Sequence, residues 1–214
     1  MRTLPLSAVA LACVACGEGK YLDGQSFEEA ITQVVVENGK GDVEIVDGFV
    51  TRVDWYGSGP LARPTVDAFV DGTTLYVSGS CSGFLSCSVD HVVEVPEGVD
   101  IYVGVTKGDV ILHEAEGAVD VDIDEGSLEA WTLEPTRLEA RIRDGDAIVE
   151  LIDPAETVDI ELQDGDIELQ LPDGKYAVET AGDRVSIEGV SIDSSMPYAV
   201  RAVSWNGKVD IIGT

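Results

Sequence analysis

The sequence predicts an all-β protein whose strands stack as the coils of a β-solenoid, and three observations predict this fold. Short runs alternate apolar and polar residues, a Gly-Asp or Gly-Ser pair precedes many of them, and these pairs recur at a nearly constant spacing. With 214 residues, 44% of them hydrophobic, the chain can bury one sizeable core. We therefore expect one folded domain over residues 28–214, with an antiparallel β-sandwich as the alternative fold.

Residues 1–12 have the layout of an export signal, because Arg2 is followed by a short apolar run and then by small residues in front of a cysteine. The segment "VALAC", which ends at Cys13, resembles a bacterial lipoprotein lipobox, whose cysteine carries the lipid and becomes the first residue of the mature chain. We expect lipidation at Cys13, with Cys16 as the alternative site. Ordinary cleavage after Ala12 would instead release a soluble secreted protein.

A lipid on the cysteine would tether the protein to the cell envelope. Residues 13–27 would then be the lipidated N-terminus and a flexible spacer, since "GEGKYLDGQSF" is polar and contains glycine. Neither Val14 nor Gly17, which follow the two candidate cysteines, is the aspartate usually linked to inner-membrane retention. The sequence therefore favours the outer membrane or the cell surface over the inner membrane.

Cys81 and Cys87 enclose five residues, a spacing that a disulfide can close in an oxidising compartment. A second interpretation starts from "VSGSCSG", which places Cys81 in a Gly-x-Cys-x-Gly pattern similar to the nucleophile elbow of hydrolases, with His91 as the nearest base. The elbow needs a helix directly after the nucleophile, which the following residues do not predict. His91 itself lies in an alternating run that predicts a solvent-facing strand position, so the sequence favours the disulfide.

From Ile31 onward nearly every segment predicts a strand with one apolar and one acidic face. A spacing of 17 to 20 residues between the glycines leaves room for two short strands and two turns, which is one coil of a two-sided solenoid. Glycine suits the corner because it adopts positive φ, and aspartate because its side chain accepts hydrogen bonds from nearby backbone NH groups. The less regular half from Val34 to Val95 is expected to be a wider start that caps the open edge of the stack. The corner glycines are Gly108, Gly126, Gly145, Gly165 and Gly182.

The chain is strongly acidic, with 41 Asp and Glu against 13 Lys and Arg and a formal charge of −28. Such a surface repels polyanions, so we expect no nucleic acid partner and membrane contact only through the lipid. In "VDVDIDEG" the side chains of Asp120, Asp122 and Asp124 share one strand face, and carboxylates of neighbouring coils would stack on them. Ca²⁺ prefers several oxygen ligands, so these three are candidate calcium ligands, with a solvated, salt-screened face as the alternative.

The segment "SCSVDHVVEVPEGVDIYVGVTKGDVIL", residues 86–112, and the Gly-Asp strands that follow it through "GKVDIIG", residues 207–213, resemble the bacterial adhesin-type domains of the DUF4097 family. The resemblance covers about residues 30–214 and depends on the repeat and on the "VEVPEG" step. It implies an exported or membrane-tethered β-solenoid with no established enzymatic activity, and it transfers no binding residue.

We therefore expect a non-enzymatic cell-envelope lipoprotein that displays an acidic β-solenoid for adhesion, binding or a structural role, with a surface protein or a polysaccharide as its partner. Trp131 and Trp205 are the candidate sugar contacts. The alternative is a carbohydrate-active or hydrolytic enzyme with a carboxylate groove. Its candidate cluster sits among many equivalent carboxylates, so we predict no catalytic residue. That cluster comprises Arg137, Arg141, Arg143, Asp144 and Asp146.

Overall fold

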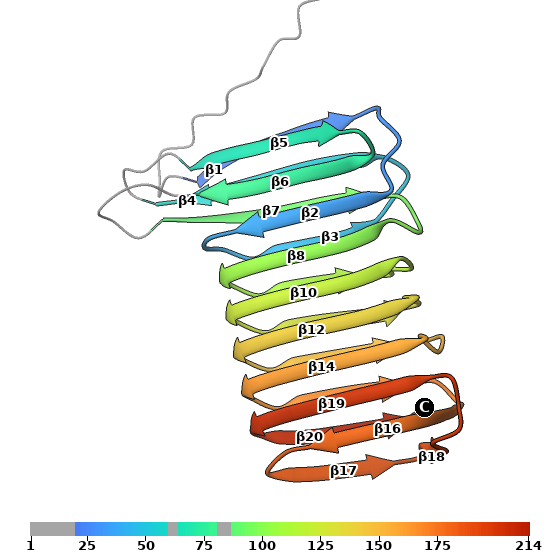
Figure 1. Cartoon of the computed structure of the whole chain (residues 1–214). Helices are drawn as coiled ribbons and strands as arrows, with labels where there is room; N and C mark the ends of the chain where they lie inside the picture. The colour runs from blue at the N-terminus through green and yellow to red at the C-terminus, as the bar shows by residue number, and fades with distance from the viewer. Residues whose placement is uncertain (1–19, 60–63, 81–86) are drawn as a thin grey trace, which may run out of the picture.

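The structure is a computed structural model that describes residues 20–59, 64–80 and 87–214, and every regular element in these ranges is a β-strand. The strands form two ten-stranded sheets, one behind the other in Figure 1. In the described part of the chain, no helix has the length and apolar character needed to cross a membrane.

We call the two sheets A and B and give their strands in spatial order. Sheet A consists of β1 (Lys20–Phe27), β4 (Thr51–Ser58), β7 (Ser88–Val95), β3 (Val43–Asp47), β9 (Val110–His113), β11 (Leu128–Leu133), β13 (Ala147–Leu151), β15 (Ile167–Leu171), β20 (Lys208–Gly213) and β17 (Arg184–Glu188). Sheet B consists of β5 (Thr65–Asp71), β6 (Thr74–Ser80), β2 (Gln33–Asn38), β8 (Asp100–Lys107), β10 (Ala118–Glu125), β12 (Arg137–Asp144), β14 (Thr157–Asp164), β19 (Ala199–Asn206), β16 (Lys175–Ala181) and β18 (Ser191–Ile192).

Each coil consists of one strand in sheet B followed by one strand in sheet A, and neighbouring coils pair in parallel. The four coils from β8 to β15 stack in the order of the sequence. This arrangement confirms the predicted β-solenoid, and the antiparallel sandwich offered as an alternative is wrong for most of the molecule. Among the described strands, antiparallel pairing is confined to β1 with β4, β4 with β7 and β5 with β6, at the N-terminal end of the stack.

That N-terminal end has the irregular, capped form that the sequence predicted. One predicted boundary, the end of the flexible spacer at residue 27, is wrong. The part of the predicted flexible spacer from Lys20 to Phe27 is strand β1, which pairs with β4 along its whole length. Without β1, the strand β4 would leave its unpaired backbone NH and C=O groups at the sheet edge. Residues 20–27 are therefore part of the sheet and not of a flexible spacer, and the predicted residues 13–19 lie outside the described part of the chain.

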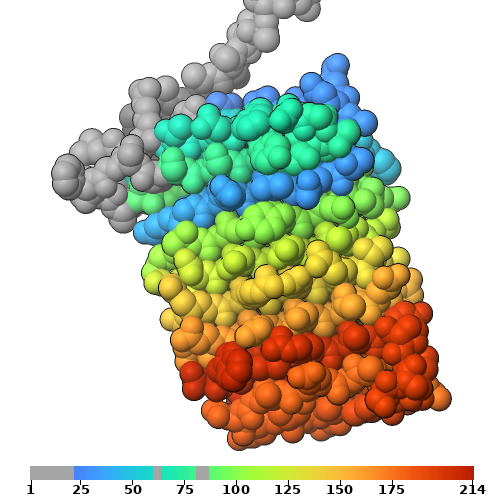
Figure 2. All heavy atoms as spheres, viewed as in Figure 1, coloured from blue at the N-terminus to red at the C-terminus, as the bar shows by residue number. Residues whose placement is uncertain are grey.

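At both ends of the stack the chain returns to insert a coil out of sequence order. The coil β2–β3 lies between β6–β7 and β8–β9. The coil β19–β20 lies between β14–β15 and β16–β17, and Figure 2 shows it as a red band with orange residues on both sides. The glycine spacing had implied that the coil opened by Gly182 follows the Gly165 coil directly. The structure instead places the Gly207 corner between them, next to Gly165.

The core lies between the sheets, where the inward side chains of successive coils form straight rows. One row crosses sheet B with no exposed side chain, and its two alanines lie beside larger valine and isoleucine side chains, which is compatible with close packing. Each large buried side chain of this kind contributes about 1.5–3 kcal/mol through the hydrophobic effect. The row consists of Val103, Val121, Ala140, Ile160 and Ala202.

The turns that lead from sheet B to sheet A explain why the Gly-Asp pair recurs in the sequence. Gly126 has φ of +145°, and a Cβ atom at this position would lie 1.9 Å from the carbonyl oxygen of Gly108 in the neighbouring coil. Beside it, the backbone NH of Ser127 donates to the Asp109 carboxylate at 2.8 Å. The same contact joins Asp166 to the Asp146 carboxylate, also at 2.8 Å. Glycine lets the coils approach each other, and aspartate satisfies a backbone donor of the next corner.

Candidate functional site

The outer face of sheet B carries one row of side chains that changes character along the solenoid. At the N-terminal end the row is aromatic, and Phe69 and Tyr76 stack with ring centroids 5.3 Å apart. Beyond β8 the row becomes charged. In spatial order the row reads Phe69, Tyr76, Val35, Tyr102, Asp120, Glu139, Asp159 and Arg201.

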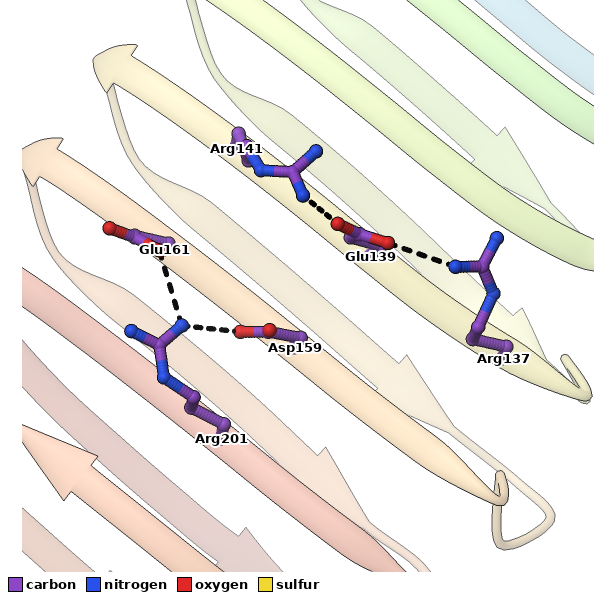
Figure 3. Close-up of polar contacts among 6 residues, drawn as sticks. All are labelled: Arg137, Glu139, Arg141, Asp159, Glu161 and Arg201. Carbon is purple, nitrogen blue, oxygen red and sulfur yellow. Dashed lines mark hydrogen bonds and ion pairs between the residues drawn. The ribbon is translucent and has the colours of Figure 1, made fainter.

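Arginines pair with the acidic side chains in the charged half of this face (Figure 3). Glu139 accepts hydrogen bonds from Arg137, at 2.9 Å, and from Arg141. Arg201 donates to Asp159 at 2.7 Å and to Glu161 at 3.2 Å, which joins two carboxylates of the neighbouring strand. The face is therefore not a uniform carboxylate ladder, because guanidinium groups flank the in-register run of Asp120, Glu139 and Asp159.

The candidate calcium ligands lie on this face, where the structure places each beside a different neighbour. Asp120 is in register with Glu139, as the predicted stacking required, but Asp122 is in register with Arg141. Asp124 lies 3.5 Å from Arg143. Within residues 20–59, 64–80 and 87–214, no group of three or more His, Cys, Asp or Glu side chains is placed to hold a metal ion. Calcium binding at Asp120, Asp122 and Asp124 thus stays a prediction.

Two adjacent hollows on the outer face of sheet B are both lined by Asp122 and Asp124, and we call the two together the sheet B groove. The first, of about 520 Å³, lies above β6, β2 and β8 and includes Tyr102 and Gly104. The second, of about 410 Å³, lies above β10, β12, β14 and β19 and includes Trp205.

Two parallel rows of side chains border the groove where it crosses β8, β10, β12 and β14. Gly104, Asp122, Arg141 and Glu161 are in register on one side. Two residues further along each strand, the second row contains Thr106, Asp124, Arg143 and Gln163, and Trp205 on β19 extends it. The inward-pointing residues between the rows form the floor, so the groove runs across the strands and along the solenoid axis.

Trp205 borders the groove with its ring largely open to solvent. Its side chain is 62% exposed, and its indole Nε1 donates to the Oε1 atom of Glu161 at 3.2 Å. This hydrogen bond, together with those from Arg201, holds the pKa of Glu161 below its ordinary value. The other candidate sugar contact, Trp131, is half-buried and lies on sheet A beside His113. The two tryptophans therefore do not share a groove.

Tyr102 lies in the first hollow, close to several carboxylates. Burial raises the pKa of its phenol, and the negative charges of Asp122, Asp120 and Glu37 add to the shift. Gly104 follows two residues later on the same face, and a Cβ atom there would come no closer than 3.6 Å to a neighbour, the Tyr102 hydroxyl. The absence of a side chain at Gly104 therefore leaves this part of the groove open.

The residues of the alternative enzyme hypothesis occupy separate structural positions. Arg137 and Arg141 pair with Glu139, and Arg143 pairs with Asp124. The Asp146 carboxylate accepts a backbone NH at the next corner. These contacts connect the three arginines and Asp146 to the framework of the solenoid, and Asp144 lies at the end of β12 in register with Asp164.

His91 corrects a sequence expectation, because its side chain is buried, at 1% exposure, and does not face solvent. The run "SVDHVVEV" has apolar residues in both phases of the alternation, and β7 points Val89, His91 and Val93 inward. Among the described residues neither ring nitrogen has a hydrogen-bond partner, and burial lowers the pKa of His91 to about 4. The ring packs against the backbone of Gly79, where a Cβ atom would lie 2.3 Å from Nε2.

The predicted cysteine sites are described only in part. Cys87 is buried, and its sulfur is engaged in a disulfide. Cys81, Cys13 and Cys16 lie outside the described residues. The pairing of Cys81 with Cys87 and the lipidation site therefore stay predictions.

Sequence analysis missed an acidic cluster on the loops that lead from sheet A back to sheet B. Five carboxylates line a hollow of about 270 Å³, and burial, with Glu97 and Glu134 nearby, raises the pKa of Glu116. Each carboxylate stands near the end of a strand, but only the stacking of the coils brings them together. They belong to Asp47, Glu97, Glu114, Glu116 and Glu134.

Comparison with known proteins agrees with this architecture. The family model named Toastrack DUF4097 matches residues 28–188, which is most of the chain. The chain belongs to the Toastrack DUF4097 family. No curated protein matches it.

Two solved structures share the Toastrack-type fold of this chain. A candidate cell adhesion protein from Clostridium sporogenes aligns with a TM-score of 0.55 at 13% identity, over 92% of this chain and 100% of that one. A candidate adhesin from Bacteroides fragilis aligns with a TM-score of 0.52 at 13% identity, over 92% and 99% of the two chains. At this level of identity the likeness establishes the fold, and a shared function is a matter for proposal.

Proposed function

We propose that this chain is a non-enzymatic adhesin-type binding module, exported and anchored in the cell envelope through a lipid on Cys13. The observation that carries the proposal is the outer face of sheet B, which is a long surface with a groove, an exposed tryptophan and charged side chains already paired with one another. Such a face can contact a ligand along its length, whereas acid–base catalysis needs two carboxyl groups in different environments. The names of the two similar structures agree with adhesion.

The lipid anchor complements the charge of the molecule. A body with a formal charge of −28 is repelled by anionic headgroups, so electrostatics alone would not hold it at a membrane. A diacylated cysteine supplies that attachment through its acyl chains. With the chain tethered in this way, the face of sheet B is free to meet a surface protein or a polysaccharide.

Two matched variants test the anchor. We expect Cys13→Ala to lose the diacyl mass at the mature N-terminus and to move from the membrane fraction to the medium, while Cys16→Ala remains lipidated. Mass spectrometry of the N-terminal peptide and cell fractionation measure both. Lipidated Cys13→Ala protein would contradict the assignment of the site.

Adhesion is tested separately, with cells that carry the full chain and otherwise identical cells that lack it. We expect the first to aggregate or to remain on a coated flow-cell surface under washing, and the second to be removed. Equal retention of the two strains, at equal surface expression, would contradict the adhesive role and leave the anchor assignment intact.

A further inference from the structure

We propose that the sheet B groove binds an extended, uncharged β-linked glycan whose axis lies parallel to the solenoid axis. The inference rests on the function proposed above, because it names the ligand class of the same face. It draws on three features of the groove: the ring that borders one end, the spacing of its polar side chains, and the balance of its charges.

The ring of Trp205 has the properties of a sugar-stacking platform. Its side chain is 62% exposed, although a large aromatic group is usually covered, and the hydrogen bond to Glu161 fixes the polar edge of the indole. A pyranose ring offers a face of CH groups that packs on an indole face. Because the indole is already oriented, binding would lose little further side-chain entropy.

The second row of the groove repeats at the spacing of a polysaccharide. Thr106, Asp124, Arg143, Gln163 and Trp205 occupy equivalent positions on five adjacent strands, and all but the half-buried Asp124 are exposed. Adjacent strands lie about 4.8 Å apart, close to the length of one pyranose unit in an extended β-linked glycan. Successive sugar units would therefore each meet one side chain, and the five side chains, which span four strand spacings or about 19 Å, match about five units.

The charges of the groove favour an uncharged ligand. In the second hollow the carboxylates of Asp122, Asp124 and Glu161 stand beside the guanidinium groups of Arg141 and Arg143, so the lining of that hollow is close to neutral. A polyanionic glycan would be repelled by the net charge of −28, and a polycation would compete with arginines that are already in place. Hydroxyl groups, in contrast, can both donate to these carboxylates and accept from the guanidinium groups.

An extended peptide fits the groove less well than a glycan. Peptides that join a sheet use the unpaired backbone groups of an edge strand. The strands beneath the groove, β8, β10, β12, β14 and β19, are all paired on both sides. Only side chains are offered there, which suits a ligand recognised through hydroxyl groups and ring faces.

Isothermal titration calorimetry of the full chain with cellohexaose and chitohexaose tests the proposal, with hexagalacturonate as the anionic comparison. We expect at least one of the two uncharged hexasaccharides to bind. Its affinity should rise along the series from two to about five units and then level off, because the row has five side chains at about one strand spacing each. Hexagalacturonate should not bind.

Trp205→Ala and Trp131→Ala form a matched pair of variants. We expect Trp205→Ala to weaken binding about tenfold or more, since ring stacking is lost, and Trp131→Ala to leave the affinity unchanged. Thermal melts check that both variants are folded, and Trp205→Ala should melt close to the wild-type protein because Trp205 is mostly exposed. A blue shift of tryptophan emission on binding, absent in Trp205→Ala, would place the sugar on this ring.

The inference is overturned if neither uncharged hexasaccharide binds, if hexagalacturonate binds best, or if the two tryptophan variants weaken binding equally. These outcomes are distinct from failure of the adhesive role. If cells that display the Trp205→Ala chain adhere normally and the glycans do not bind, the glycan site is wrong and the adhesin-type function stands.

Discussion

At the scale of single residues, the corner glycines are the positions that the fold constrains most strongly. Gly108, Gly126, Gly145 and Gly165 all have φ between +140° and +150°, and a Cβ atom on any of them would lie within 2.1 Å of a carbonyl oxygen in the neighbouring coil. Two restrictions therefore act together: the backbone conformation excludes most residues, and the neighbouring coil excludes a side chain.

Gly126→Ala and Gly98→Ala separate these two restrictions. Both glycines have positive φ, but a Cβ atom on Gly98 would meet nothing within 4 Å. We expect Gly98→Ala to lower the free energy of unfolding by about 1 kcal/mol and Gly126→Ala to lower it by about 3 kcal/mol or more, because the coils must also move apart. Urea denaturation measures both, and equal losses would contradict the close contact between coils.

His91 predicts a specific dependence of stability on pH. Its pKa of about 4 in the folded protein lies below the ordinary value of 6.5, so folding favours the neutral ring. The resulting contribution to stability is complete above about pH 6.5 and is lost as the pH falls toward 4, because the unfolded chain then binds the proton first. Carboxylates titrate in the same range, so a reference variant is required.

His91→Leu is that reference, since leucine is similar in size and needs no hydrogen-bond partner. Between pH 7 and pH 4.5 we expect the wild-type protein to lose about 2 kcal/mol more unfolding free energy than His91→Leu. Urea denaturation at the two pH values gives the difference. Parallel pH profiles for the two proteins would show that His91 is not held neutral by burial.

At the scale of elements, arginines placed among the acidic side chains on the outer face of sheet B reduce the repulsion between those side chains. Four of the thirteen basic residues, Arg137, Arg141, Arg143 and Arg201, lie on β12 and β19. Each exposed pair is worth little by itself, commonly below about 1 kcal/mol. Their collective effect is to flank the run of carboxylates that lie directly opposite one another, Asp120, Glu139 and Asp159, with positive charge, which reduces a repulsion that would destabilise the sheet.

This pairing bears on calcium. Because Asp122 and Asp124 already stand beside arginines, we expect calcium chloride and sodium chloride at equal ionic strength to shift the melting temperature by the same amount. Differential scanning calorimetry in the two salts makes the comparison. A larger shift in calcium that disappears in Asp122→Asn would instead support the calcium site predicted from the sequence.

The strands themselves could be predicted from the sequence, because the alternation of apolar and polar residues and the recurring Gly-Asp pair are local signals. The contacts of the candidate site could not. Trp205 meets Glu161, forty-four residues earlier, only because β19 lies next to β14, and nothing local to either strand records that adjacency. The sequence also could not show which face of β7 points into the core, since valine occurs on both faces. Only packing in the folded chain buries the face that contains His91.

At the scale of the whole molecule, the inserted coils make the sequence order a poor guide to the domain boundary. The family match ends at residue 188, yet β19 and β20 follow it and lie inside the stack. These strands form the ladder between β14–β15 and β16–β17. The C-terminal residues are therefore part of the core and are no appendage to it.

A chain that ends at Gly189 should accordingly lose the cooperative unfolding of the full protein. Removal of β19 and β20 exposes the inner edges of β14 and β15 and leaves β16 and β17 without their parallel neighbours. Far-ultraviolet circular dichroism during heating measures the effect. A chain shortened only by Thr214 is the control, and a sharp transition in both would contradict a structural role for the inserted coil.

The insertion of β2 between β6 and β8 also governs how the molecule bears tension. In a simple solenoid, a pull on one terminus unzips the outermost coil, then the next, at low force, because each coil touches only its neighbours. Here a pull from the N-terminal side first frees β1 and then acts on β2. Because β2 is hydrogen-bonded to β6 on one side and to β8 on the other, both sets of hydrogen bonds must break at once. A tether under flow would thus yield in one abrupt step rather than unravel gradually.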